Sequence, residues 1–336
     1  MPELPEVETI ARELAPRVVG RTITGFKTDW PRAIRHPDLT RFARDVLDRE
    51  ILEVARRAKW LVLTLSGDLA LIIQVKMTGQ LFVVPPDVTG DRHVHHVFSL
   101  SDGMELRIRD TRKFGRLGLY RRDDAGRVLG ADEALELFAG HGPEPLDEAF
   151  TLRDFRARLR ARRGRLKPLL LDQAFLAGIG NIYADEALWR SRLHPLRSAP
   201  SLRPADERRL YTAIRDVLNE GIARRGSSID DYTSLEGDGE MQDFLNIYQR
   251  TGRPCPRCGR PTRRIVLGAR GTHFCSWCQR LPGNQRTDAV RALLRSATAA
   301  SRRGPRWSEL PVGAGAVGAR QRGEASNARP RGGRSK

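Results

Sequence analysis

All four cysteines of this 336-residue chain fall between Cys255 and Cys278. They form two pairs, Cys255-Pro-Arg-Cys258 and Cys275-Ser-Trp-Cys278, with sixteen residues between the pairs. Each pair can present two thiolates from a tight turn, and four thiolates complete a tetrahedral zinc site. Such a site leaves no position open for water, so we expect one structural Zn²⁺. Redox Cys-x-x-Cys motifs are the alternative, but two copies at this spacing disfavour them.

The amino terminus is a second place where the residue types could do chemistry. It reads Met1-Pro2-Glu3-Leu4-Pro5-Glu6, and a small second residue permits removal of the initiator methionine. Pro2 would then carry a free secondary amine, which titrates at about pH 8 and can attack a sugar C1′ as a nucleophile. Glu3 and Glu6 lie within one helical turn and could act as proton donor and supporting carboxylate. Spacing alone favours the plainer alternative, in which Pro and Glu simply begin a helix.

A Gly178-Ile179-Gly180-Asn181 turn joins two stretches with helical patterning. Glycine ends the first helix, and Asn181 is a good N-cap for the second. The amides at such a helix start form an anion site suited to a phosphate, although ordinary capping explains the same residues. The pattern indicates a helix-turn-helix variant with a longer turn.

The cysteine module is rich in arginine. A strand, a turn and a strand between the two cysteine pairs would display these side chains together: Arg257, Arg260, Arg263, Arg264 and Arg270. Such a hairpin could place its tip in a DNA groove. Alternatively, the arginines only solvate a fold that zinc stabilises.

The whole chain has a formal net charge of +18, which favours a polyanionic partner, DNA or RNA before an anionic membrane. Half of this excess lies in residues 281–336, so a basic surface on the folded part is also expected. No apolar run of about 18 residues is present, which argues against a transmembrane helix. The acidic first residues do not resemble a secretory signal, so a cytoplasmic location is expected.

The remaining pattern predicts an α+β protein. An amphipathic helix is expected over 4–18. Short apolar segments separated by turn residues predict a β-sandwich or barrel, with strands at 22–27, 51–56, 60–65, 69–75, 81–84, 96–101, 104–109 and 117–121. Helical patterns follow at 131–139, 151–162, 167–177, 182–190 and 204–225. Residues 140–145 are typical of a linker, and residues 226–245 are typical of a mobile loop. The Arg/Gly/Ala-rich end of the chain is typical of a disordered tail.

Taken together and in this order, three motifs resemble the formamidopyrimidine-DNA glycosylase family: Pro2-Glu3-Leu4-Pro5-Glu6 at the amino terminus, Gly178-Ile179-Gly180-Asn181-Ile182-Tyr183, and the terminal cysteine finger. The resemblance covers about residues 2–281. It implies an N-terminal β-sandwich domain with flanking helices, a helical helix-two-turns-helix domain and a C-terminal zinc finger. The corresponding domain boundaries are 2–130, 131–246 and 247–281, followed by a basic, disordered tail at 282–336.

The resemblance also implies catalytic roles. Pro2 would be the Schiff-base nucleophile, Glu3 the acid/base that assists opening of the sugar ring, and Glu6 a supporting carboxylate. Lys59, in Arg57-Ala58-Lys59-Trp60, matches a strand lysine that contacts phosphate near the lesion and aids catalysis. Without the resemblance, Lys59 would be taken for an edge-strand lysine facing water.

Further residues match family positions that contact DNA. Asn181 and Arg270 match phosphate-binding residues, and Arg270 is counted with the catalytic set. Lys167 matches a supporting basic residue of the lesion site. His93 and His95 match histidines near the DNA backbone, and metal binding by them is weakly supported.

A flipped nucleotide leaves a gap in the duplex that the protein must fill. Three side chains match the family's gap-filling residues: Met77, Arg112 and Phe114. An apolar wedge that unstacks DNA makes physical sense. Without the resemblance, Met77 and Phe114 would be interpreted as core residues.

The sequence departs from the family in places. The stretch 226–246, which would cover the flipped base, is acidic, and Glu240-Met241-Gln242 stands where aromatic residues often precede the glutamine. This leaves the lesion preference open. Thr111 and Lys113 replace a commoner proline and arginine. The sister family, endonuclease VIII, usually begins Pro-Glu-Gly-Pro-Glu, and Leu4 argues against it.

The expected function is therefore excision of oxidised purines, such as 8-oxoguanine and formamidopyrimidines, from double-stranded DNA. Strand cleavage by β- and δ-elimination at the abasic site would follow, as part of base excision repair by a monomer at the bacterial nucleoid. Two rivals remain. One is a zinc-containing DNA-binding regulator that recognises a specific sequence, and the other is a glycosylase for oxidised pyrimidines.

Overall fold

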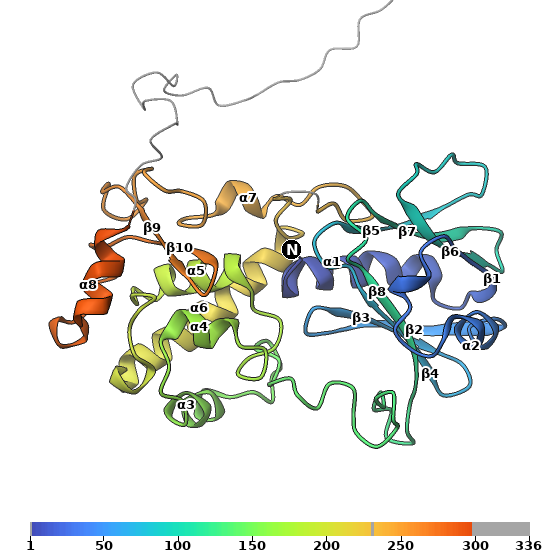
Figure 1. Cartoon of the computed structure of the whole chain (residues 1–336), viewed down its shortest axis with the longest axis horizontal. Coiled ribbons are helices and arrows are strands. Elements are labelled where there is room, and N and C mark those ends of the chain that lie inside the picture. Colours follow the sequence, from blue (N-terminus) through green and yellow to red (C-terminus); the bar gives the residue numbers. More distant parts are fainter. Residues whose placement is uncertain (1, 230–231, 298–336) are drawn as a thin grey trace, which may run out of the picture. The chain divides into compact units, whose positions relative to one another are not determined.

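The computed structural model describes residues 2–229 and 232–297. Its large antiparallel sheet has eight strands in the order β5-β7-β6-β1-β2-β3-β4-β8 (Figure 1). All eight lie where the sequence predicts them, within two residues at each end: β1 (Thr22–Thr28), β2 (Arg49–Arg57), β3 (Trp60–Leu65), β4 (Leu69–Gln74), β5 (Gly79–Val84), β6 (Val94–Leu100), β7 (Glu105–Asp110) and β8 (Arg116–Arg121).

The sheet divides into two halves at the junction of β1 and β2. These strands pair only through Thr22 and Ile23, while the rest of β1 pairs with β6. The half β5-β7-β6-β1 and the half β2-β3-β4-β8 send apolar side chains into one shared core, which includes Ile23, Leu61, Leu63, Phe98 and Leu117. The expected β-sandwich is therefore confirmed.

Helix α1 (Leu4–Val18) has the predicted bounds and belongs to two cores. Leu4 packs in the core of the helical domain, whereas Val7, Ile10 and Leu14 pack against the sandwich. The sandwich also carries two short elements that sequence patterning did not predict, η1 (Pro31–Ala33) and α2 (Leu39–Asp45).

The helical domain packs around Phe155, Phe175, Tyr183 and Leu210. It contains α3 (Leu152–Arg160), α4 (Leu166–Leu171), α5 (Asn181–Arg190), η2 (Ala199–Ser201), α6 (Pro204–Ala223) and α7 (Met241–Phe244). Helix α4 is shorter than the predicted 167–177, because the chain turns after Leu171 and follows two non-helical turns to Gly180. This is the helix-two-turns-helix arrangement.

The cysteine module contains the expected hairpin, β9 (Arg263–Leu267) paired with β10 (Arg270–Phe274). Strand β10 lies against α5. The hairpin therefore connects the finger to the helix that follows the glycine turn.

One expected helix is absent from the structure. Residues 131–139 form turns instead, because Gly130 N donates to Leu135 O and Leu137 N donates to Val128 O, which folds the segment back on itself. Phe138 then packs on the outer face of the sandwich with Ala70 and Ile72.

The prediction of a disordered tail from residue 282 is also wrong for its first part. The chain continues through η3 (Gly283–Gln285) into helix α8 (Asp288–Arg295), whose Val290 is buried. The rest of the predicted tail, 298–336, lies outside the described residues. The expected α+β class, with sandwich, helical domain and finger, is confirmed.

No helix in the described part of the chain has the length and apolar character needed to span a membrane.

Candidate active site and zinc centre

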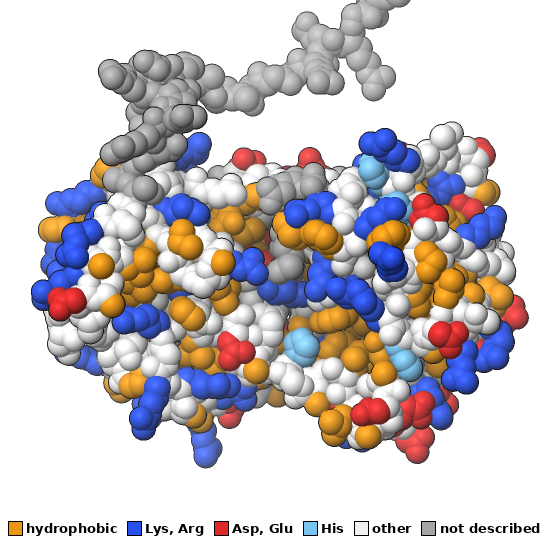
Figure 2. Space-filling view, in the orientation of Figure 1, with side chains coloured by type: hydrophobic (Ala, Val, Ile, Leu, Met, Phe, Trp, Pro, Cys, Tyr) orange, Lys and Arg blue, Asp and Glu red, His pale blue; other side chains and the backbone are white. Residues whose placement is uncertain are grey.

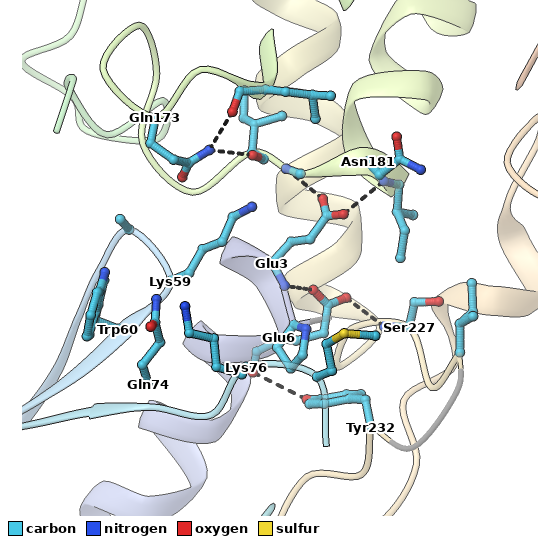
Figure 3. A pocket seen from close by; sticks show the side chains of 18 of the residues that line it. Glu3, Glu6, Lys59, Trp60, Gln74, Lys76, Gln173, Asn181, Ser227 and Tyr232 are labelled. Carbon is cyan, nitrogen blue, oxygen red and sulfur yellow. Dashed lines mark hydrogen bonds between the residues drawn. The ribbon is translucent and has the colours of Figure 1, made fainter. Parts of the chain in front are cut away.

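A cavity of about 520 Å³ lies where the start of α1 meets the helix-two-turns-helix segment (Figure 3). Its walls come from separate parts of the sequence, which include the amino terminus, the β2–β3 turn, the β4–β5 turn, the turn before α5 and the first residue of β10. Further lining residues are His141, Ser227, Ile229, Tyr232 and Tyr248. Figure 2 shows Lys and Arg side chains gathered around a hollow in the middle of the face drawn. The predicted residues that line the cavity are Pro2, Glu3, Glu6, Lys59, Met77, Asn181 and Arg270.

Pro2 is buried and is positioned by its neighbour Glu3. The chain is held at Leu4, whose backbone N–H donates to Gly178 O at 3.0 Å. The Glu3 carboxylate accepts from the backbone amides of Gly180 and Ile182, both at 2.8 Å, and of Tyr183 at 3.3 Å. The amino terminus is thereby fixed to the beginning of α5. Met1, whose removal the prediction requires, lies outside the described residues.

This arrangement corrects the expected phosphate site at the start of α5. The amides do bind an anion, as helix N-termini favour, but the anion is the carboxylate of Glu3 from the same chain. The N-cap is Gly180 rather than the predicted Asn181. The Asn181 side chain instead donates to Gly271 O at 3.0 Å, while its buried Oδ1 has no partner among the described residues.

Glu6 lies behind Glu3 and is almost completely buried. Its carboxylate accepts from Glu3 N at 2.9 Å, Tyr183 Oη at 2.7 Å and Ser227 N at 2.8 Å. Burial, helped by the nearby charge of Glu3, raises the pKa of Glu6, although these hydrogen bonds oppose the shift. Glu6 therefore joins α1 and α5 to Ser227 behind the cavity.

Lys59 stands on the tight β2–β3 turn, which is held from below by Glu144. The Glu144 carboxylate accepts from the Ala58 amide at 2.6 Å and pairs with Arg56 at 2.7 Å and Arg57 at 2.8 Å. Burial lowers the pKa of Lys59, whereas the charges of Glu3 and Glu6 act in the opposite direction. Lys59 is thus a cavity lysine close to two carboxylates, and the alternative of an edge-strand lysine facing water does not describe it.

The predicted wedge residues form one cluster at the mouth of the cavity. An Arg112 guanidinium nitrogen lies 3.5 Å from Met77 Sδ, and the guanidinium carbon lies 4.7 Å from the centre of the Phe114 ring. Phe114 is 45% exposed, so it is not a core residue. We refer to Met77, Arg112 and Phe114 as the wedge.

Lys167 does not reach the cavity, contrary to the expectation of a lesion-site residue. It is completely buried, and its Nζ donates to Asp185 Oδ1 at 2.7 Å and to Asn181 O at 2.9 Å. Asp185 in turn accepts from His273 N on β10 at 2.9 Å. Lys167 therefore supports the turn and the finger from within the protein.

His93 and His95 lie outside the cavity. His95 is buried and its Nδ1 lies 2.8 Å from Asp29 Oδ1, which leaves His93 as the more accessible of the two. Among the described residues, the four cysteines are the only group of three or more side chains placed to hold a metal ion. The weakly supported metal site at these histidines therefore gains nothing from the structure.

The four cysteine Sγ atoms lie within 4.8 Å of one another. Cys258 and Cys275 are 3.5 Å apart at sulfur, and Cys255 and Cys278 are 4.0 Å apart. Tetrahedral coordination with Zn–S bonds of about 2.3 Å requires sulfurs about 3.8 Å apart, so this set fits one structural Zn²⁺. Trp189 Nε1 donates to Cys255 Sγ at 3.4 Å and links the centre to α5. The expected zinc site is confirmed.

Sequence reasoning missed several cavity residues because no local motif marks them. They include Gln74, Lys76, His141, Gln173, Ser227 and Tyr232. Gln173 holds the turn before α5, since its side chain donates to Ile179 O at 2.9 Å and accepts from Gly178 N at 3.0 Å. Only the tertiary fold brings these positions together.

Three family models match the chain in order. They are the formamidopyrimidine-DNA glycosylase N-terminal domain at residues 1–117, its H2TH domain at 141–233, and the zinc finger found in FPG and IleRS at 252–281. Among curated relatives, the formamidopyrimidine-DNA glycosylase of Chloroflexus aurantiacus is 47% identical over 83% of this chain and 98% of that relative. That of Pelotomaculum thermopropionicum is 44% identical over 84% of this chain and all of the relative.

Solved structures give the same result. A complex of a Lactococcus lactis FPG mutant with DNA that contains Fapy-dG superposes with a TM-score of 0.76 and 35% identity, over 83% of this chain and 100% of that one. A structure of MutM with carbocyclic 8-oxo-G DNA has a TM-score of 0.75 and 35% identity over the same shares. The fold and the order of the three modules are therefore shared with these DNA-bound proteins.

Proposed function

This chain belongs to the formamidopyrimidine-DNA glycosylase family, and from that premise we propose that it excises oxidised purines from duplex DNA and then cleaves the strand, with Pro2 as nucleophile. The observation that carries the proposal is the position of Pro2. It lies in one cavity with the carboxylate of Glu3, the amine of Lys59 and the guanidinium of Arg270. A nucleophile, a proton donor and two cations for phosphate are the groups that this chemistry needs.

The steps can be written with the side chains of this chain. The neutral Pro2 nitrogen attacks C1′ of the damaged nucleotide, the bond from C1′ to the base breaks, and the base leaves as an anion that takes a proton from water. The Glu3 carboxylate takes the proton that the Pro2 nitrogen loses and donates it to O4′ as the sugar ring opens and the iminium forms. The Glu3 carboxylate then takes a proton from C2′ as the C3′–O bond breaks and the 3′ phosphate leaves, and loss of the C4′ proton to water expels the 5′ phosphate as the C5′–O bond breaks. Lys59 and Arg270 stabilise the phosphates as charge develops on them.

The finger and the wedge complete the proposal. Zn²⁺ bound by the four cysteines supplies structure and no chemistry, because all four ligand positions are filled by thiolates. Asn181 and Arg270 would contact phosphates of the damaged strand. His93 would contact the backbone farther along, with the buried His95 beside it as a supporting residue. The wedge would fill the gap left by the flipped nucleotide. Lys167 is proposed as a positioning residue only.

Borohydride trapping tests the nucleophile. We expect wild-type protein to give a covalent adduct with an 8-oxoguanine duplex, because borohydride reduces the iminium. A chain whose N-terminal extension keeps Pro2 in a peptide bond should give none, and proteolytic removal of that extension should restore the adduct. An adduct from the extended chain would overturn the role of Pro2.

Binding and excision assays with damaged duplexes distinguish the proposed function from its two rivals. A sequence-specific regulator would bind one DNA sequence regardless of damage and would be indifferent to the extension before Pro2. A pyrimidine glycosylase would excise thymine glycol faster than 8-oxoguanine. We expect faster excision of 8-oxoguanine.

For the organisation of the chain, we propose the sequence-derived boundaries 2–130, 131–246 and 247–281. We further propose that the protein acts as a monomer on the DNA of a bacterial cell. Limited proteolysis and sedimentation in the presence and absence of DNA measure these two points directly.

A further inference from the structure

A second pocket, of about 350 Å³, lies on the sandwich beside the wedge. Three segments form it: the chain around η1, the β4–β5 turn and the β7–β8 turn. Lys76 and Met77 line both this pocket and the cavity that holds Pro2. Phe114 lines only the second pocket, so Met77 is the wedge residue that the two spaces share.

The charged side chains that line the second pocket are all cations: Arg32, Arg35, Lys76, Lys113 and Arg116. None of them takes part in an ion pair within residues 2–229 and 232–297, although many other arginines of the chain do. The carboxylate of Asp110, at the start of the β7–β8 turn, is occupied by neutral donors, Thr78 Oγ1 and the amides of Arg112 and Gly115. Burial and the neighbouring Arg35 lower the pKa of Lys76, as expected where like charges crowd together.

Trp30 gives this cationic pocket a rigid wall. Lys113 Nζ lies 4.4 Å from the centre of the Trp30 ring, and the Arg32 guanidinium carbon lies 5.8 Å from it. Cation–π contacts of this kind hold long side chains in place without neutralising them. The pocket is therefore an ordered group of unpaired positive charges, which attracts an anion.

We propose that this second pocket binds the phosphodiester backbone of the strand opposite the lesion. The inference rests on the proposed function, in which the wedge enters the duplex and the damaged nucleotide moves into the cavity of Pro2. If Met77 and Phe114 stand between the strands, the undamaged strand lies on the far side of the wedge. The unpaired cations of the second pocket are on that side.

The test is a double-mutant cycle between protein charge and DNA charge. The probe is a duplex with a non-cleavable tetrahydrofuran site, in which single phosphates are replaced by neutral methylphosphonates in one strand or the other. The variants are Arg32→Gln and Lys113→Gln, both at exposed positions. Arg41→Gln is the matched control, because Arg41 is exposed and lies on α2, outside both pockets.

We expect each pocket variant to weaken binding roughly tenfold and to lower the slope of log K against log salt by about 0.9 for each phosphate that the variant no longer neutralises. A methylphosphonate at the contacted position of the opposite strand should weaken wild-type binding by a similar factor and have little further effect on the variant. Arg41→Gln should keep the full sensitivity.

If the pocket variants are coupled only to methylphosphonates in the damaged strand, the assignment of this pocket to the opposite strand is wrong. Unchanged affinity and salt slope in both pocket variants would overturn the site itself. Because binding to the tetrahydrofuran duplex does not require Pro2 chemistry, these outcomes are distinguishable from failure of the borohydride test.

Discussion

The carboxylate of Glu3 binds three backbone amides at the beginning of α5, so one side chain joins the amino terminus to the helical domain. The residue identities at this site could be predicted, because Pro2, Glu3 and Glu6 are parts of one short motif. The binding of the α5 amides to Glu3 could not be predicted. The glycine turn is locally typical of an open anion site, and only the tertiary fold places an acid of the same chain against it.

Glu3→Gln tests whether this carboxylate takes part in the chemistry. The amide is nearly isosteric but carries no charge and no transferable proton, so we expect excision of 8-oxoguanine to slow by about 10²- to 10⁴-fold. The measurement is single-turnover excision with enzyme in excess, which separates chemistry from product release.

Glu186→Gln is the matched control for Glu3→Gln. Glu186 is also buried and also accepts backbone amides, those of Asn246, Ile247 and Tyr248, but it does not line the cavity. We expect it to reduce stability while single-turnover excision by the folded protein stays near wild type. Equal losses of rate in the two variants would mean that Glu3 acts through structure alone.

At the scale of elements, the strands were predictable because each apolar run lies between turn residues and faces one shared core. Residues 131–139 have helical spacing. Two hydrogen bonds, from Gly130 N to Leu135 O and from Leu137 N to Val128 O, fold them into turns instead. Helix α8 was missed for the opposite reason. Its residues lie in Arg- and Ala-rich sequence, where Val290, Leu293 and Leu294 are too few to stand out as a helical pattern.

Helix α8 packs on the finger and continues past the end of the matched finger model at residue 281. Its apolar side chains join a cluster with Ile265 and Phe274 of the hairpin, and Arg263 of β9 lies within 3.4 Å of the carbonyls of Leu294 and Ala297 at the end of the helix. We therefore expect the hairpin, and with it Arg270, to depend on this helix for its stability.

Two truncations separate α8 from the basic segment that follows. Deletion of 298–336 removes a net charge of +7 and should lower the salt dependence of DNA binding without changing the melting temperature. Deletion of 283–336 also removes α8 and should cost roughly 2 kcal/mol of stability, the contribution of about one buried aliphatic side chain after losses of chain entropy.

If deletion of 283–336 also speeds the loss of Zn²⁺ to a chelator and the amide exchange in β9 and β10, the lost stability lies in the finger. Identical melting temperatures and zinc release for the two truncations would show that α8 is dispensable to the finger.

At the scale of the whole molecule, the hydrophobic cores of the sandwich and of the helical domain meet at α1. Each of these two domains contains a buried histidine. His96 lies on β6 of the sandwich, and His194 follows α5 and packs its ring on Phe274 at 4.7 Å between ring centres. Burial is the main cause that lowers the pKa of His96 to about 4 and that of His194 to about 3. Both imidazoles are therefore neutral in the folded protein at a pH at which the same histidines of the unfolded chain already bind protons.

The sign of the resulting pH dependence follows from these values. Because both pKa values are lower in the folded state than the unfolded value of about 6.5, the unfolded chain binds more protons below that pH, and stability falls as the pH drops. Each histidine should cost about 2 kcal/mol at pH 5 relative to neutral pH, and the loss should level off below the folded pKa. Urea unfolding at pH 7.5 and pH 5 measures it, and the double variant His96→Asn/His194→Asn should lose about 4 kcal/mol less than wild type between the two pH values. Since the other titrating groups are common to both proteins, an equal loss in wild type and the double variant would show that these buried histidines do not cause the acid sensitivity.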